Sequence, residues 1–160
     1  AGTAFDNAAE TPFGTQPAGT PQALEVTRLA IKLNFAKAMN DQIQLSGLLP
    51  LQAGTPLLGQ TVVVDVGSVA RAFVLNEKGK SPKAVDTLSV GIKPKDGKVK
   101  FSAKFSKGTY RIALAPSGLV NADTSTNLTV KVTLLFNQTF FQVDKAQFYT
   151  ATAARTGKTK

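Results

Sequence analysis

Apolar and polar residues alternate along most of this chain. In LEVTRLAIKLNF, Leu29, Ile31 and Leu33 fall on one side of an extended backbone, and in QIQLSGLLPL, Ile43 and Leu45 do the same. A period of two is typical of a β-strand with one buried side and one solvent-facing side. The pattern recurs in QTVVVDVGSVARAFVL, TLSVGIKPKDGKVKFSAKF and NLTVKVTLLFNQTFFQVDKAQFYT. The chain is therefore predicted to be all-β.

Short polar pairs separate these segments and predict where the chain reverses. Gly67-Ser68 has glycine in the first central position, which favours a type II′ hairpin. Asp96-Gly97 is a strong hairpin signal, and turns are also expected at Asn137-Gln138 and Asn40-Asp41. The segment GTYRIALAPSGLVNAD lacks clean alternation, and its Ala-Leu-Ala followed by Pro-Ser-Gly predicts a short helix near 108–115.

About eight short strands joined by turns predict an antiparallel β-sandwich of immunoglobulin-like shape with one short helix. We place this domain at residues 23–152. Residues 1–22 are rich in Ala, Gly, Thr and Pro, which predicts an extended N-terminal arm or linker. The small and basic residues 153–160 predict a C-terminal tail that leaves the domain.

Apolar residues that share a strand face predict the hydrophobic core. Pairing about Asp96-Gly97 places Ile92 opposite Phe101 on the core side of that hairpin. The predicted core residues are Leu29, Ile31, Leu33, Leu45, Val62, Val64, Phe73, Val90, Ile92, Phe101, Phe105, Val132, Leu134 and Phe141.

The last hairpin has a predicted register of its own. A two-residue turn at Asn137-Gln138 places Leu134 opposite Phe141. The apolar phase shifts afterwards to Ala146 and Phe148, which predicts a β-bulge near Asp144-Lys145.

Arg71 stands out because it shares a predicted strand face with the apolar Val69 and Phe73. Two interpretations remain open for this side chain. It either extends its guanidinium outward from a strand end, or it makes a buried ion pair or anion contact.

The other side of the Asp96-Gly97 hairpin collects lysines. Pairing predicts Lys95 opposite Lys98, Lys93 opposite Lys100, and Ser89 opposite Lys104. Like charges placed directly opposite destabilise a sheet by up to about 1 kcal/mol per pair. One explanation is that the lysines keep the sheet soluble and block edge-to-edge pairing. The other is an anion-binding face made of Lys93, Lys95, Lys98, Lys100 and Lys104.

The amino-acid composition limits the catalytic and metal-binding chemistry that the chain can perform. The 160 residues fit one domain, and the chain contains no Cys, His or Trp. The absence of histidine removes the usual general base of nucleophilic triads and the commonest transition-metal ligand. No phosphate-cradling glycine loop or calcium loop is present. We therefore expect a protein that is not an enzyme and that holds no cofactor and no metal, with calcium bound between loops as the alternative left open.

The charge is unevenly distributed. Nineteen basic and ten acidic residues give a net charge of +9, which favours an anionic partner. Residues 77–111 carry ten of the basic and three of the acidic residues, or +7 of that total. No run reaches the roughly 18 apolar residues that a membrane-spanning helix requires, so no membrane span is expected.

The N-terminal arm has two large apolar residues, Phe5 and Phe13. Either the arm is a flexible linker, or these two side chains dock it onto a neighbouring module or subunit. An extended arm of this kind can add a strand to an open sheet edge.

Several stretches resemble a known group of sequences. LAIKLNF, QTVVVDVGSVARAFVLNEKGK, GTYRIALAPSGLVNAD and the closing LLFNQTFFQV with its Gly/Lys tail are similar to uncharacterised β-rich domains in large exported proteins of environmental bacteria, planctomycetes among them. The resemblance covers residues 26–157. It implies an extracellular or cell-surface sandwich module of a bacterium, often at the end of a longer chain, and it carries over no functional residues.

These observations lead to two expected functions. The first is a non-enzymatic structural or adhesive module outside the cell, or a subunit of a larger assembly, with neighbouring protein subunits or further copies of itself as partners. The second is a binding module for an anionic polymer, either acidic polysaccharide or nucleic acid, that uses the lysine-rich sheet face.

Overall fold

The computed structural model describes residues 22–51, 54–136 and 139–160. Phe5, Phe13 and the turn Asn137-Gln138 lie outside the described residues. The described strands are β1 (Gln22–Ala23), β2 (Glu25–Asn34), β3 (Asp41–Pro50), β4 (Thr61–Val66), β5 (Val69–Val74), β6 (Thr87–Val90), β7 (Lys98–Gly108), β8 (Thr124–Phe136), β9 (Thr139–Thr152) and β10 (Thr156–Thr159). An α-helix, α2 (Arg111–Leu114), continues into a 3₁₀ turn, η2 (Ala115–Ser117).

The strands form one continuous sheet. Its order is β5-β4-β8-β9-β10-β2-β3-β7-β6, and every neighbouring pair in that order is antiparallel. The two-residue β1 adds to β9 in parallel, outside this path. The prediction of an all-β, largely antiparallel fold with one short helix is therefore confirmed.

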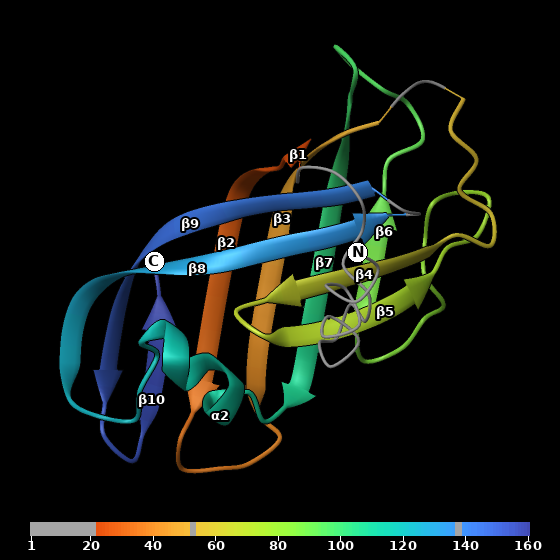
Figure 1. The fold of residues 1–160 in the computed structure, drawn as a ribbon. Coiled ribbons are helices and arrows are strands. Elements are labelled where there is room, and N and C mark those ends of the chain that lie inside the picture. Colours follow the sequence, from red (N-terminus) through yellow and green to blue (C-terminus); the bar gives the residue numbers. More distant parts are fainter. Residues whose placement is uncertain (1–21, 52–53, 137–138) are drawn as a thin grey trace, which may run out of the picture.

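The sheet bends back over itself. Figure 1 shows β4, β5, β8 and β9 running across β2, β3 and β7, so that the two halves of the sheet form two layers. The long strands β8 and β9 curve as they pass from one layer to the other (Figure 1). Twisted sheets of many strands curl in this way, and the result here is a partly open barrel. Its edge strands, among the residues described, are β5 and β6.

This architecture differs from the expected sandwich in two respects. In the described part of the chain the sheet has ten strands, where about eight were predicted from turn spacing. The layers also belong to one hydrogen-bonded sheet, so the two separate sheets of an immunoglobulin-like sandwich are not confirmed among the described residues. Alternation reports which side of a strand is buried, but a bent sheet and two packed sheets bury the same side of each strand.

The predicted C-terminal tail is wrong. Residues 156–159 form β10, which is hydrogen-bonded to β9 on one side and to β2 on the other. Gly157 pairs with Ala151 and Leu33, and the side chain of Tyr149 lies over it in the space that a Cβ atom would fill. A short polar segment with glycine carries no strand signal by itself, and its place is decided by the two strands that enclose it.

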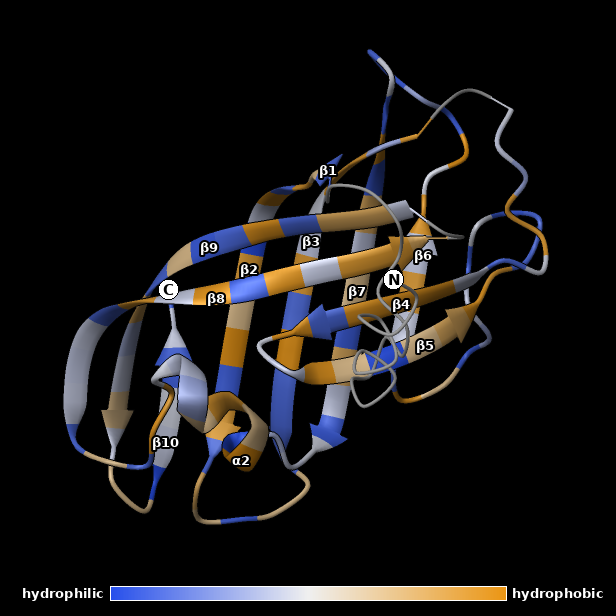
Figure 2. Ribbon diagram, viewed as in Figure 1, coloured by the Kyte–Doolittle hydropathy of each residue, from blue (hydrophilic) through white to orange (hydrophobic). Residues whose placement is uncertain are grey.

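The core lies between the two layers. Strands β2, β3 and β7 alternate between apolar and polar residues along their length, as Figure 2 shows. Every predicted core residue is buried except Ile92, which is 55% exposed. Ile92 lies in an irregular segment between β6 and the turn at Asp96-Gly97, whereas Val99 of β7, just after the turn, is buried.

The Asp96-Gly97 turn is present, but the register beyond it is shifted. Lys95 pairs with Lys98 across the turn, as predicted. Further along, Phe101 pairs with Val90, where Ile92 was predicted. Pro94 has no N–H to give to a ladder, which fits an interruption at this position. The shift is two residues, so the side chains of β6 and β7 keep their predicted side of the sheet even though their cross-strand partners change.

The last hairpin has the predicted register without the predicted bulge. Leu134 pairs with Phe141 and Lys131 with Asp144, and the ladder continues unbroken to Thr124 and Ala151. Beyond Asp144, the side chains that face the core are not all apolar. They include the polar Gln147 and the amphipathic Tyr149, and both are buried. Phe148 points the other way and is 39% exposed.

Two turn predictions need correction as well. Gly67 and Ser68 both have positive φ, 57° and 84°, which matches a type I′ hairpin and not type II′. Asp41 is not a turn residue, because it begins β3 and is fully buried. Its carboxylate accepts hydrogen bonds from the backbone N–H groups of Asn34 and Tyr110, both at 2.7 Å.

The short helix predicted near 108–115 is confirmed by α2.

Candidate functional site

The five predicted anion-binding lysines lie on the outer surface. Lys98, Lys100 and Lys104 occupy alternate positions of β7, and residues that alternate along a strand share one face of the sheet. Lys93 and Lys95 belong to the irregular segment that leads into the turn. All five are exposed. Four of them line one groove, and Lys104 shares the outer face of β7 with Lys98 and Lys100.

Four of these lysines surround an open groove of about 820 Å³. Its apolar part comes from Leu48 of β3 and from the exposed Ile92. The groove is lined by Leu48, Gly91, Ile92, Lys93, Lys95, Asp96, Lys98 and Lys100. We call this the lysine groove. Lys104 lies further along β7, outside it.

The lysine pairs differ from the prediction because of the shifted register. Lys100 pairs with Leu48 of β3, and its carbonyl accepts a hydrogen bond from Gly91, so Lys93 is not its cross-strand partner. Lys104 pairs with Gln44 and Thr87, and Ser89 pairs with Ser102. Only Lys95 and Lys98 are direct like-charge neighbours among the predicted pairs.

Acidic residues are scarce around the groove. Lys98 Nζ lies 3.3 Å from Glu25 Oε2, and the two side chains are 45% and 52% exposed. An exposed pair of this kind contributes about 0–1 kcal/mol to stability. Within the described chain, Lys93, Lys95, Lys100 and Lys104 have no acidic partner within ion-pair distance. Most of the positive charge of this face is therefore available to an external anion.

Sequence reasoning missed two cations that the fold adds to the same side. Arg28 of β2 pairs with Ser46 of β3 after a register shift between Val26 and Arg28. Lys80, which lies before β6 in the chain, pairs with Ser89 of β6 through an isolated β-bridge. The sequence had no signal for either residue, because Arg28 is more than fifty positions from Lys80 and both join the face only through cross-strand pairing.

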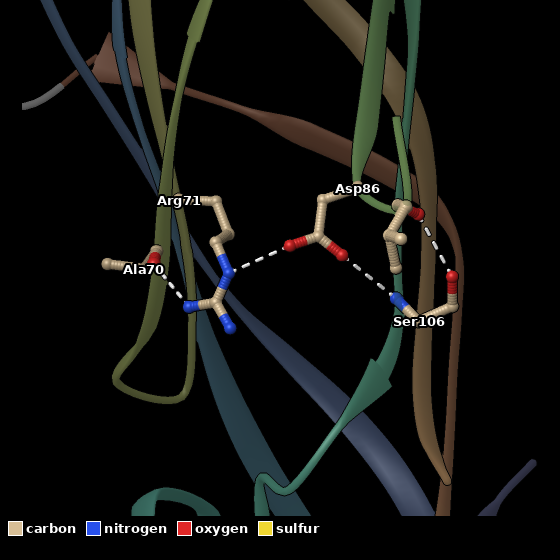
Figure 3. Close-up of polar contacts among 5 residues, drawn as sticks. Ala70, Arg71, Asp86 and Ser106 are labelled. Carbon is tan, nitrogen blue, oxygen red and sulfur yellow. Dashed lines mark hydrogen bonds and ion pairs between the residues drawn. The ribbon is translucent and has the colours of Figure 1, made fainter. Parts of the chain in front are cut away.

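A second polar site connects the two free edges of the sheet. Arg71 of β5 donates from Nε to Asp86 Oδ2 at 2.9 Å, and Asp86 precedes β6 (Figure 3). The other carboxylate oxygen accepts the backbone N–H of Ser106 at 3.0 Å. Arg71 Nη1 turns back to the carbonyl of Ala70 at 2.8 Å (Figure 3). We call this set the edge clasp.

Aromatic rings support the edge clasp. The Arg71 guanidinium carbon lies 5.9 Å from the centroid of the Phe105 ring and 5.6 Å from that of Tyr110. The rings of Phe73 and Phe105 stack at 6.1 Å. Cation–π contacts of this length are favourable. The structure shows an ion pair for Arg71, but a partly exposed one and not the buried pair considered from the sequence, since the Arg71 side chain is 40% exposed. The carboxylate that completes it comes from a loop that sequence spacing did not connect with β5.

Burial perturbs two titratable groups near these elements. Desolvation raises the pKa of Tyr110, and the negative charge of Asp86 raises it further. Desolvation also raises the pKa of Asp65, against the opposing effect of the Ser68 N–H that its carboxylate accepts. Both raised pKa values arise from structural roles of the side chains. Tyr110 packs on the edge clasp, and Asp65 caps the β4–β5 turn.

Among the residues that the structure describes, no group of three or more His, Cys, Asp or Glu side chains is placed to hold a metal ion. No described helix is long and apolar enough to cross a membrane.

Comparison with known proteins adds no relative. No protein-family model, no curated protein and no solved structure matches this chain.

Proposed function

We propose that this protein is a non-enzymatic adhesive module, located outside a bacterial cell or on its surface, that binds an anionic polymer through the lysine groove. The observation that carries the proposal is the gathering of four exposed lysines around one open groove. Among the described residues that line it, Asp96 is the single acidic one. The location rests on the resemblance of residues 26–157 to β-rich domains of exported bacterial proteins.

The position of β7 argues against a purely protective role for the lysines. Lysines guard a sheet when they lie on an edge strand. Lys100 and Lys104 lie on β7, which is hydrogen-bonded to β3 on one side and to β6 on the other. These two residues therefore have no free edge to protect.

Electrostatics explains why such a groove would favour a polymer. A concave surface of one charge sign raises the local concentration of an opposite charge and accelerates its association. The exposed lysines each meet one anionic group weakly, so useful affinity requires several contacts at once. A polymer with repeated charges supplies them.

The test removes charge from the groove. We expect the combined Lys93→Gln, Lys98→Gln and Lys100→Gln substitutions to weaken retention on an anionic polymer column at about 0.05 M salt, and the difference to shrink at about 0.5 M salt because of screening. A matched control carries Lys37→Gln, Lys158→Gln and Lys160→Gln, which remove the same charge from exposed positions outside the groove.

Equal loss of retention in both triple variants would show that net charge alone is responsible and would contradict the proposal. Unchanged retention of the groove variant, with higher stability, would show that the lysines serve solubility.

A second candidate function is that of an assembly subunit. Among the described residues, β5 is hydrogen-bonded only to β4. It contains neither lysine nor proline, and its outward-facing Ala72 and Val74 are exposed. Such an edge suits strand addition by an extended segment of a neighbouring copy. The arm with Phe5 and Phe13 is the segment we propose for this role.

Light scattering separates this candidate from the first. The full chain should form concentration-dependent oligomers, and deletion of residues 1–21 or the substitution Ala72→Lys should leave monomers. If the full chain is monomeric at every concentration, the assembly function is wrong and the polymer-binding proposal is unaffected.

A further inference from the structure

A row of hydroxyl groups crosses the outer face of the sheet beside the lysine groove. Ser46 of β3 pairs with Ser102 of β7, and Ser102 pairs with Ser89 of β6. Cations end the row on both sides, since Ser46 pairs with Arg28 and Ser89 with Lys80. Neighbouring strands lie about 4.8 Å apart, so the five residues span roughly 19 Å in a line across the strands.

The row lies in hollowed surface. Two open hollows of about 400 and 560 Å³ share Ser46, Ser89 and Ser102 in their lining. The first also includes Arg28, Lys80 and Lys104. The second includes Lys100, which also lines the lysine groove. We call the two hollows together the serine furrow.

The hydroxyl groups of the serine furrow are uncommitted. Throughout the described part of the chain, the side chains of Ser46, Ser89 and Ser102 have no hydrogen-bond partner. The nearby cations Arg28 and Lys80 likewise lack an ion-pair partner among the described residues. A hydroxyl group both donates and accepts, so the furrow offers both kinds of hydrogen bond to a ligand between flanking positive charges.

We infer that the occupant of the serine furrow is an acidic polysaccharide, whose chain crosses the strands. This inference rests on the proposed binding of an anionic polymer and specifies its chemical class. The sugar hydroxyls hydrogen-bond to the three serines, and the carboxylate groups contact Arg28, Lys100 and Lys104. Arginine in particular binds carboxylate in a two-point geometry.

The lining disfavours the other anionic polymers. Single-stranded nucleic acid is usually held by aromatic side chains on which its bases stack. The aromatic residue in the lining of the furrow, Phe101, is only 2% exposed. A neutral sugar chain would find no aromatic platform either, so charge is needed for binding. Polyphosphate supplies charge but carries no hydroxyl groups for the serines to recognise.

The test removes hydroxyl groups without changing charge. Binding of a defined oligogalacturonate is measured by calorimetry for the wild-type chain and for the Ser89→Ala/Ser102→Ala variant, with inorganic polyphosphate as a probe of charge alone. Two lost hydrogen bonds should weaken oligogalacturonate binding about tenfold. Polyphosphate binding should be unchanged. The Ser102→Thr variant, which keeps a hydroxyl group, should bind nearly as the wild type does.

The outcomes distinguish this inference from the proposed function. Unchanged oligogalacturonate binding by the double variant, or equal loss for both probes, would overturn the inference. So would tighter wild-type binding of a poly(dT) oligonucleotide than of oligogalacturonate, which would make nucleic acid the occupant. In these cases the anionic-polymer function itself stands. If the wild-type chain binds none of the three anionic probes, both proposals fail.

Discussion

At the scale of single residues, the edge clasp makes the most specific prediction. Asp86 holds Arg71 through one carboxylate oxygen and the Ser106 N–H through the other. Replacing Asp86 with Ala leaves both donors without this acceptor, and we expect a loss of about 1–3 kcal/mol in the free energy of unfolding. Denaturation in urea measures this loss.

The control for the clasp is Glu77→Ala, which removes an exposed acidic residue outside it. It should change the free energy of unfolding by less than about 0.5 kcal/mol. Asp86→Asn keeps an acceptor for Ser106 and should fall between the two. If Asp86→Ala is as stable as the control, the clasp does not hold the edges together.

Tyr149 makes a prediction about alkaline pH. Its side chain is fully buried, and its hydroxyl group donates to the Val120 carbonyl at 2.8 Å. Burial raises the pKa of Tyr149 to about 12 from the ordinary 10.0. A raised pKa favours the protonated form in the folded state, so this contribution to stability is full below pH 10 and is lost as the pH rises towards 12.

The variant Tyr149→Phe isolates this effect. At pH 7 it should be less stable than the wild type by about 0.5–1.5 kcal/mol because the hydrogen bond to Val120 is lost. Between pH 10 and 12 the gap should narrow, since only the wild type has this group to deprotonate. Tyr110 is present in both proteins and cancels. A gap that stays constant over this range would mean that Tyr149 titrates alike in the folded and unfolded states.

Phe101 and Ile92 form a matched pair for the core, because both were predicted to be buried and only Phe101 is. Phe101 is 2% exposed and Ile92 is 55% exposed. Phe101→Ala should cost about 3–5 kcal/mol of the free energy of unfolding through lost burial and cavity formation. Ile92→Ala should change it by less than about 0.5 kcal/mol. Similar costs for the two variants would contradict the observed irregular segment before the Asp96-Gly97 turn.

At the scale of elements, we expect the four-residue strand β10 to contribute more to the stability of the sheet than its short length suggests. It separates β9 from β2 in the sheet, and Thr159 Oγ1 accepts the backbone N–H of Ile31 at 3.0 Å in the protein interior. Deleting residues 153–160 exposes the edges of both neighbours and uncovers Tyr149. We therefore expect that the shortened chain no longer unfolds cooperatively on heating. Circular dichroism as a function of temperature measures this.

Deletion of residues 1–21 provides the comparison at the other end of the chain. It leaves every described strand in place and should keep cooperative unfolding. If the chain without residues 153–160 unfolds as cooperatively as the full chain, then β10 is dispensable and the sheet tolerates a gap between its two halves.

At the scale of the whole molecule, the fold concentrates positive charge at one end of the strand order. The segment 77–111, which carries +7 of the net +9, contains β6 and β7. The adjacent β2 adds Arg28, so the charge extends across the outer face of this half of the sheet. A molecule polarised in this way should approach an anionic polymer with this face first, and the orientation should weaken as salt shortens the range of the field.

On the open side of the barrel, β5 and β6 are linked by the edge clasp and not by a strand ladder. The path of hydrogen-bonded strands ends at β5 and at β6. Closing a sheet completely removes its edges, whereas here two edge strands remain and are held by side chains. The binding face lies on the outer side of β6 and β7, and the candidate assembly edge is β5, which the clasp links to the start of β6.

The local sequence pattern alone determined which side chains of the strands face inward and where two of the chain reversals lie. Alternation identified the inward residues of the strands, and turn chemistry located the reversals at Gly67-Ser68 and Asp96-Gly97, because both depend on neighbours only a few residues apart. The outward position of the predicted lysines followed from the same alternation. It survived the register shift because a shift of two residues preserves the side of the sheet.

Only the tertiary structure decided how the strands associate. Whether they form one bent sheet or two packed sheets, and whether residues 156–159 form a strand, depends on pairing between segments far apart in sequence. The edge clasp and the serine furrow belong to this class. Asp86 meets Arg71, and Arg28 joins Ser46, because hydrogen bonds between strands fix positions that no local periodicity encodes.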